Sequence, residues 1–207
     1  MLPRLFGLVA IVFALFCAPS AARADSMRFA ANLSGLAESP ANASPGTGFT
    51  IVNFDTTAHT MRVQVAFSGL LGTTTASHIH SATAVAGTGT VGVATELPSF
   101  TGFPLGVSSG TYDNTFNTAL TAFYNPSFLS ANGGTAASAE TALFAGMTQG
   151  KAYLNIHSTS FPSGEIRGFL QASPVPAPPG LVLLGSGAFM MLLSSGLRVV
   201  RRRLVTV

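Results

Sequence analysis

The sequence contains a single cysteine, and only 8% of its 207 residues are charged. That residue, Cys17, lies in an apolar run near the start of the chain, so the rest of the chain can form no disulfide bond. Between Asp25 and Ser173 there are four cations against seven anions, a net charge of −3. A mildly acidic body without a stripe of Lys or Arg lacks the features that bind phosphate backbones, so we expect no nucleic-acid partner.

Motifs of the common enzyme classes are also missing. The sequence has no nucleophile elbow, no phosphate-cradling glycine loop and no pair of catalytic carboxylates. The glycine string at 87–92 is not placed between a strand and a helix of a βαβ unit, so it predicts a turn. We therefore favour a non-enzymatic role.

Residues 1–24 have the layout of a secretory signal peptide. A basic residue, Arg4, precedes an apolar run at 5–16, and Pro19 ends that run. The small residues Ala22 and Ala24 then form a cleavage site before Asp25. The run is too short to span a bilayer comfortably, which favours a removed signal over an anchor.

The other end of the chain predicts a membrane segment. Residues 173–180 form a proline-rich linker, which is stiff because each proline ring fixes φ. Residues 181–203 then combine an uncharged apolar run with an arginine cluster, and 204–207 form a short tail. Under the positive-inside rule the arginines stay in the cytoplasm, so the body lies outside the cell.

This order of elements resembles the PEP-CTERM sorting signal, although Ala177 stands where that family usually has glutamate. The resemblance implies a bacterial exported protein that is anchored in the envelope membrane and cut by an exosortase-type enzyme. The product would be held at the cell surface or released to the extracellular matrix. A plain single-pass anchor is the alternative. The sorting residues would be Val175, Pro176, Pro178, Arg201, Arg202 and Arg203.

Residues 25–172 predict one all-β domain. Apolar and polar residues alternate with period two, 22 glycines occur in the chain, and long helical periodicity is scarce. This pattern predicts an antiparallel β-sandwich or barrel. The expected strands centre on Phe29, Ala31 and Leu33; on Phe49, Val52 and Phe54; on Met61, Val63, Val65 and Phe67; on Ala152, Leu154 and Ile156; and on residues 165–171.

The middle of the domain, residues 87–134, mixes Gly, Thr, Ser, Asn and aromatic residues without a period, so we expect loops and edge strands there. One short helix is expected at 135–144, between a Gly-Gly pair and Gly146.

Six short motifs together resemble the CHRD domain, the family named after chordin. They are Leu33-Ser-Gly35, Glu38-Ser-Pro40, Phe67-Ser-Gly-Leu70, Ser77-His-Ile-His80, Tyr153-Leu-Asn-Ile-His157 and Pro162-Ser-Gly-Glu-Ile-Arg-Gly168. The resemblance implies an immunoglobulin-like β-barrel with limited likeness to Cu/Zn superoxide dismutase. It implies no settled biochemical activity.

Three histidines are the candidate site. His78 and His80 are two apart on an expected strand, so both rings project from the same face, about 7 Å apart at their Cα atoms. His157 from a second strand would complete a three-nitrogen site for zinc or copper with one position open. The alternative is that the histidines bond to backbone groups and to Glu165 or Arg167, and so lock two strands together.

Glu165 and Arg167 would also share a face, where they can pair with each other or orient a histidine from the second shell of a metal site. Two functions follow. The first is an exported envelope or matrix protein whose β domain binds extracellular polysaccharide or surface proteins, or has a structural role. The alternative is a copper or zinc domain with activity like that of superoxide dismutase.

Overall fold

The computed structural model describes residues 26–173. The predicted signal peptide at 1–24, and the linker, membrane segment and sorting residues from 174 onward, lie outside the described residues. Within 26–173, no helix is long and apolar enough to cross a membrane.

Eight strands and two α-helices make up the described part of the chain. The strands are β1 (Ser26–Ser34), β2 (Thr47–Asp55), β3 (Thr60–Ser68), β4 (Thr74–His80), β5 (Gly110–Asn117), β6 (Tyr153–Ser158), β7 (Ile166–Phe169) and β8 (Gln171–Ser173). The helices are α1 (Pro126–Ala131) and α2 (Ala136–Thr148), with 3₁₀ turns η1 (Gly35–Ala37) and η2 (Thr121–Phe123).

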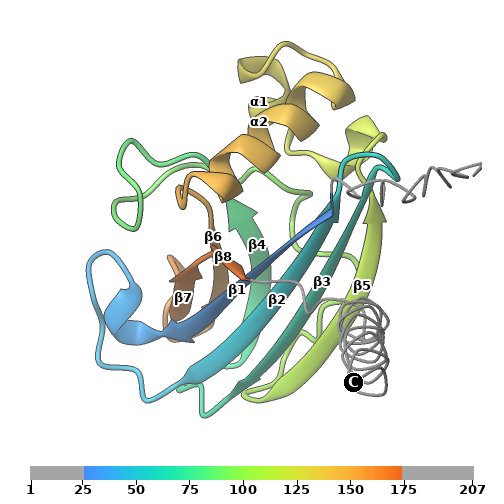
Figure 1. Cartoon of the computed structure of the whole chain (residues 1–207). Coiled ribbons are helices and arrows are strands. Elements are labelled where there is room, and N and C mark those ends of the chain that lie inside the picture. The colour runs from blue at the N-terminus through green and yellow to red at the C-terminus, as the bar shows by residue number, and fades with distance from the viewer. Residues whose placement is uncertain (1–25, 174–207) are drawn as a thin grey trace, which may run out of the picture.

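All eight strands belong to one antiparallel sheet. Its order is β4-β6-β7-β1-β2-β3-β5, and β8 pairs with β1 beside β7. The sheet curls, with the two helices at one of its ends (Figure 1). The prediction of a mostly antiparallel β domain is confirmed. The sequence predicted a sandwich or a barrel, and the structure shows a single sheet curled into a half-barrel.

The segment between β4 and β5, residues 81–109, runs beside β4. Backbone hydrogen bonds join Ala94 N–H to Ile79 at 2.9 Å and Phe100 N–H to Ser77 at 3.0 Å. Phe100 and Phe103 are buried in the core beside Tyr112 of β5. This irregular segment therefore bridges the two end strands of the curled sheet. For residues 87–134 the sequence predicted loops and edge strands.

The predicted helix is confirmed as α2. Thr135 caps it, and its hydroxyl accepts a hydrogen bond from the backbone N–H of Ser138. The Phe144 ring packs edge-on against Phe29 and Phe54 of the sheet, at centroid distances of 6.3 and 5.4 Å. Helix α2 thus covers the core at one end of the sheet.

Helix α1 and strand β5 lie in the stretch that showed no period. Asn125 caps α1 and Pro126 stands in its first turn, an arrangement that favours a helix start. The sequence predicted loops and edge strands in this stretch, so β5, an end strand of the sheet, agrees with the prediction and α1 does not.

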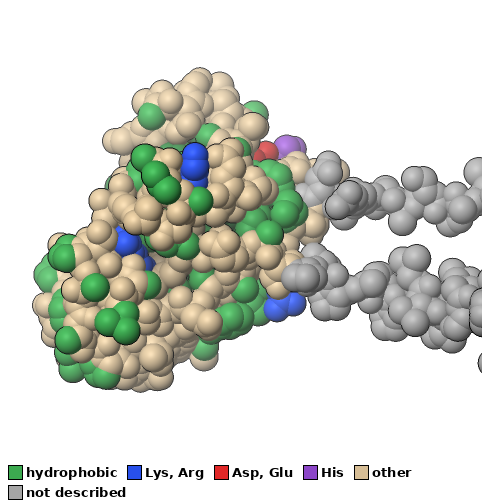
Figure 2. Space-filling view, turned by 60° about the vertical axis from the view of Figure 1, so that its left-hand side comes forward, with side chains coloured by type: hydrophobic (Ala, Val, Ile, Leu, Met, Phe, Trp, Pro, Cys, Tyr) green, Lys and Arg blue, Asp and Glu red, His purple; other side chains and the backbone are tan. Residues whose placement is uncertain are grey.

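The two halves of the sheet differ in how their outer faces are covered. In β2, β3 and β5 the buried core residues are separated by more exposed ones. Phe49, expected to share the burial of Val52, lies on the opposite face of β2 and is 43% exposed. In β4, β6 and β7, by contrast, consecutive residues are buried, so loops cover the outer face there. In the view of Figure 2, charged side chains are few and isolated.

Candidate metal centre

His78, His80 and His157 meet on the covered outer face of the sheet. Ile79, between the first two, is fully buried in the core, so the flanking histidines project outward from β4. His157 lies on β6, directly opposite Ala76 of β4. The small Ala76 side chain leaves room for the His157 ring to lean toward His78.

The three rings converge as the sequence predicted. Their centroids are 5.3 Å apart for His78 and His157, 6.0 Å for His78 and His80, and 6.1 Å for His80 and His157. One ring nitrogen from each lies within 4.8 Å of the others. Nitrogens around a tetrahedral zinc ion are about 3.3 Å apart, so the rings need to close by no more than about 1.5 Å.

Each ring is oriented by a backbone carbonyl. The oxygen of Pro98 lies 2.6 Å from Nε2 of His78, that of Val91 lies 2.8 Å from Nδ1 of His80, and that of Pro162 lies 2.9 Å from Nδ1 of His157.

A carbonyl only accepts, so these ring nitrogens must carry the hydrogen. In a neutral imidazole the other nitrogen then holds a lone pair. Those other nitrogens, Nδ1 of His78 and Nε2 of His80 and of His157, are buried and have no hydrogen-bond partner.

Burial keeps the rings neutral. It lowers the pKa of His78 and of His157, and the proximity of His157 lowers that of His78 further. The effect is largest at His80, whose pKa falls to about 4 because burial disfavours the charged ring. At neutral pH the cluster therefore offers three lone pairs, the form that a metal ion binds.

His80 is also held by a stack of flat groups. Its ring lies parallel to that of Tyr153, its partner across the β4–β6 ladder, at a centroid distance of 4.7 Å. The guanidinium of Arg167 lies 4.7 Å from the Tyr153 ring centroid and 5.6 Å from that of Phe169. This stack fixes the plane of the His80 ring.

Glu165, predicted to orient a histidine, has other partners. Its carboxylate accepts hydrogen bonds from the Ser44 hydroxyl at 2.6 Å and from the backbone N–H groups of Leu71 and Gly72 at 2.5 and 3.2 Å. Burial alone would raise the pKa of Glu165, but these bonds together with one from Ser158 hold it below its usual value. Glu165 therefore ties loops to the sheet, and the carbonyls take the orienting role.

Arg167, the other residue predicted to orient a histidine, is buried beside the site. It donates hydrogen bonds to the carbonyls of Ala37 at 2.5 Å and Gly89 at 3.1 Å. Its Nε lies 3.7 Å from Oε2 of Glu38, so its carboxylate neighbour is Glu38 and not Glu165. Arg167 stacks on Tyr153, which stacks on His80, and its charge also lowers the pKa of His80.

Sequence reasoning did not assign Glu38 and Asn155 to the site. Both are buried, and Oε1 of Glu38 and Oδ1 of Asn155 have no hydrogen-bond partner. Burial raises the pKa of Glu38 to about 7, while the charge of Arg167 and the Ser39 N–H lower it. The sequence did carry a signal for Asn155. It is two residues from His157 on the same strand, so both side chains project from the same face.

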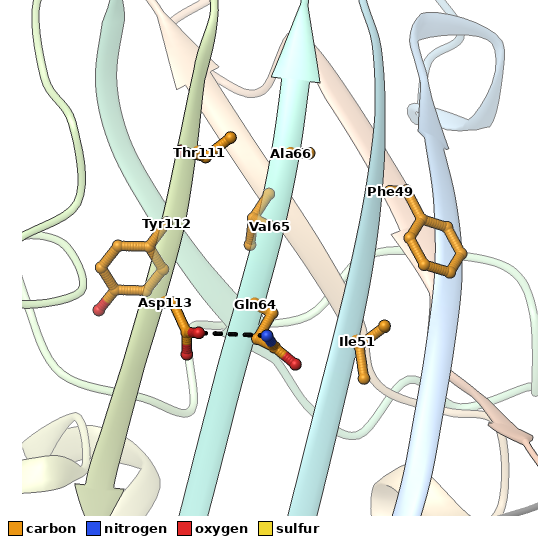
Figure 3. Close-up of a pocket in the computed structure, with 8 residues that line it drawn as sticks. All are labelled: Phe49, Ile51, Gln64, Val65, Ala66, Thr111, Tyr112 and Asp113. Carbon is orange, nitrogen blue, oxygen red and sulfur yellow. Dashed lines mark hydrogen bonds between the residues drawn. The ribbon is translucent and has the colours of Figure 1, made fainter. Parts of the chain in front are cut away.

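The open half of the sheet carries a different surface. A shallow hollow crosses the outer face of β2, β3 and β5, where the Gln64 amide donates to Asp113 at 3.1 Å (Figure 3). Its lining residues are Phe49, Ile51, Gln64, Val65, Ala66, Thr111, Tyr112 and Asp113. It holds no histidine, and the histidine cluster lies elsewhere on the sheet.

The described residues form one β domain, a curled antiparallel sheet with polar side chains gathered under its loops. The chain belongs to the CHRD family, whose domain model matches residues 29–170. The family expected from the six motifs is thus confirmed, and membership indicates a non-enzymatic binding or structural domain. No curated protein and no solved structure matched the chain.

Proposed function

We propose that this CHRD domain binds one transition-metal ion, copper or zinc, through His78, His80 and His157. In this proposal the chain is exported, and the domain acts outside the cell as a binding protein of the envelope or matrix. Three neutral imidazoles are a donor set that suits both metals, and they leave at least one coordination position open.

The observation that carries the proposal is the set of three buried ring nitrogens without partners. A purely structural role leaves each of them unsatisfied, at a cost of about 1–3 kcal/mol apiece. A water molecule has only two hydrogens to donate, so a single water cannot satisfy three acceptors. One metal ion satisfies all three.

Orientation of the rings supports the same conclusion. In histidines that bind metals, the N–H of the other ring nitrogen almost always donates a hydrogen bond to a carbonyl, a carboxylate or a water molecule. Here all three rings meet a backbone carbonyl in this way. Burial of His78 and His80 favours a firmly held ion over rapid turnover of a diffusing substrate, so we place binding ahead of superoxide chemistry.

Metal content tests the proposal. The full chain, purified in detergent and dialysed against copper or zinc, is expected to retain one ion per chain by mass spectrometry. His78→Ala, His80→Ala and His157→Ala should each weaken binding by about 100-fold or more.

The matched control is His59→Ala. His59 is the remaining histidine of the chain, its side chain is 52% exposed, and it pairs with Glu140 away from the cluster. Its replacement should leave the metal content unchanged. A parent chain that retains no metal, or a His59→Ala variant that loses it equally, contradicts the proposal.

Export is tested separately at the tail. Replacing Arg201, Arg202 and Arg203 with neutral residues should disturb retention and processing, because the stop charge and sorting element are lost. Localisation and processing are followed by cell fractionation and immunoblotting. A variant that is processed and localised like its parent overturns the sorting proposal but leaves the metal proposal intact.

A further inference from the structure

Five of the seven buried polar atoms without partners among the described residues belong to one neighbourhood. Three are the ring nitrogens of the histidines, and the others are Oε1 of Glu38 and Oδ1 of Asn155. Both oxygens can accept hydrogen bonds: Oδ1 of Asn155 as an amide carbonyl, and Oε1 of Glu38 when its carboxyl group is ionised. Among the described residues, the His, Cys, Asp and Glu side chains that could share one ion are the three histidines and not Glu38. Asn155 is the cross-strand neighbour of His78.

The strand register places Asn155 between His78 and Arg167, and Arg167 is the charged neighbour of Glu38. Asn155 of β6 lies directly opposite His78 in one ladder and directly opposite Arg167 in the other. Side chains opposite each other in an antiparallel pair share a face, with Cβ atoms about 5 Å apart. Along β6, Asn155 and His157 also share that face.

Gly164 shows that Asn155 and Glu38 meet. A Cβ atom at Gly164 would lie 2.5 Å from Nδ2 and 2.8 Å from Oδ1 of Asn155, and 2.8 Å from Oε1 of Glu38. The amide and the carboxylate therefore surround the same point, which only a residue without a side chain leaves free. The charged neighbour of Glu38 is Arg167 of β7, and Tyr153 of β6 is the neighbouring titratable group.

We infer that Glu38 and Asn155 form a hydrogen-bond-accepting subsite at the coordination position that the three histidines leave open. The inference rests on the proposed metal site. A metal-bound water has two hydrogens, and the subsite offers two acceptors without partners. Protonated ligands, in the simplest case water, are retained there, and anions are disfavoured because they bring lone pairs against the two oxygens.

Anion affinity of the loaded protein tests this inference. The full chain in detergent is loaded with Cu²⁺ and titrated with azide at fixed pH, with binding followed by visible absorption. Glu38→Gln removes the carboxylate and keeps its shape, so it is expected to bind azide about tenfold more tightly than the parent. Asn155→Ala should also tighten binding, and it gives a second test if Glu38→Gln does not fold.

Spectroscopy gives an independent readout. Pulsed EPR of the Cu²⁺ protein in H₂O and D₂O should show exchangeable protons of a bound water in the parent, and a weaker signal in both variants. Asp113→Asn is the matched control, since it makes the acid-to-amide change on the open half of the sheet and should alter neither result.

The outcomes separate the two proposals. A parent chain that takes up no Cu²⁺ overturns the metal site and the subsite with it. Stoichiometric Cu²⁺ with the same azide affinity in parent and both variants overturns the subsite alone. Tighter azide binding in Asp113→Asn equal to that in Glu38→Gln also overturns it, because the effect would then be one of net charge.

Discussion

The two halves of the sheet follow the same register rules but end in opposite surroundings. On β2 and β3 the outward residues, such as Gln64 and Ala66, face solvent between buried core residues. On β4 and β6 the outward residues, such as His78 and Asn155, are as buried as the core residues between them. One half of the sheet thus has a hydrophobic inner face alone, and the other half has a second, polar interior outside the sheet.

Loops make the difference. The 81–109 segment supplies the carbonyls for His78 and His80, the β6–β7 loop supplies the carbonyl for His157, and Glu38 follows η1. Polar groups removed from water need partners, and the covered half provides them for all but a few atoms. Most of those atoms lie in one neighbourhood, so the candidate site belongs to the covered half of the sheet.

The largest effect is expected where the cover is tied down. Glu165→Gln should lower the free energy of unfolding by about 3 kcal/mol or more. An amide has one acceptor oxygen, so it cannot accept all the hydrogen bonds that the two oxygens of the buried carboxylate accept. Urea denaturation followed by circular dichroism measures the change. Unchanged stability would mean that the loops are held without Glu165.

Acid should weaken the covered half of the metal-free protein. The pKa of His80 falls from 6.5 to about 4 on folding, so between these pH values the unfolded chain binds a proton that the folded chain does not. Stability contributed by the neutral ring is present above pH 6.5 and is lost as the pH falls toward 4. A shift of this size corresponds to about 3 kcal/mol.

The control for this pH dependence must cancel the opposing contribution of another titrating group. Glu38, with its pKa raised to about 7, binds its proton more tightly when folded and so favours the folded state as the pH falls from 7 toward 4.5. Comparing the parent with a variant that carries Gln at positions 78, 80 and 157 cancels that contribution. The difference in unfolding free energy between the two should shrink on acidification, and a constant difference would contradict the neutral, buried histidines.

Metal should stabilise the folded chain by an amount close to the contribution of the His80 pKa shift. An ion that binds only the folded chain, at a free concentration one hundred times its dissociation constant, adds about 2.7 kcal/mol. Differential scanning fluorimetry of the full chain with and without zinc should show a rise in melting temperature of several degrees. The variant with Gln at positions 78, 80 and 157 should show none, and an equal rise in that variant would point to binding elsewhere.

Strand β3 of the open half was the most predictable strand from sequence. Met61, Val63, Val65 and Phe67 alternate with Arg62, Gln64 and the small Ala66, and all four are buried in β3. That pattern is visible in sequence because solvent selects polar residues on one face. Where both faces are buried, as on β6, solvent selects no polar face and the alternation weakens.

The site divides in the same way. The His-x-His spacing fixed the face of His78 and His80, and the family motifs linked them to His157. The carbonyls of Val91, Pro98 and Pro162 were beyond prediction, because a carbonyl carries no residue identity and these lie in loops without a period. Glu165 and Arg167 were expected to pair with each other or to orient a histidine. Their hydrogen bonds go instead to groups outside the strands, whose positions no local sequence pattern encodes.

The smallest effect is expected at Asp113, on the open half. Its carboxylate lies 2.5 Å from the Arg62 guanidinium and accepts a hydrogen bond from Gln64, in a setting where both charged side chains are about half exposed. The hydrogen bond from Arg62, aided by its charge, lowers the pKa of Asp113. Solvent nevertheless screens such a pair, and ordering two long side chains offsets most of the attraction. Asp113→Asn should therefore leave the urea midpoint unchanged within error and insensitive to added salt, although it makes the same acid-to-amide change as Glu165→Gln. If instead Asp113→Asn destabilised the chain as much as Glu165→Gln, burial under the loops would not be what distinguishes the two halves of the sheet.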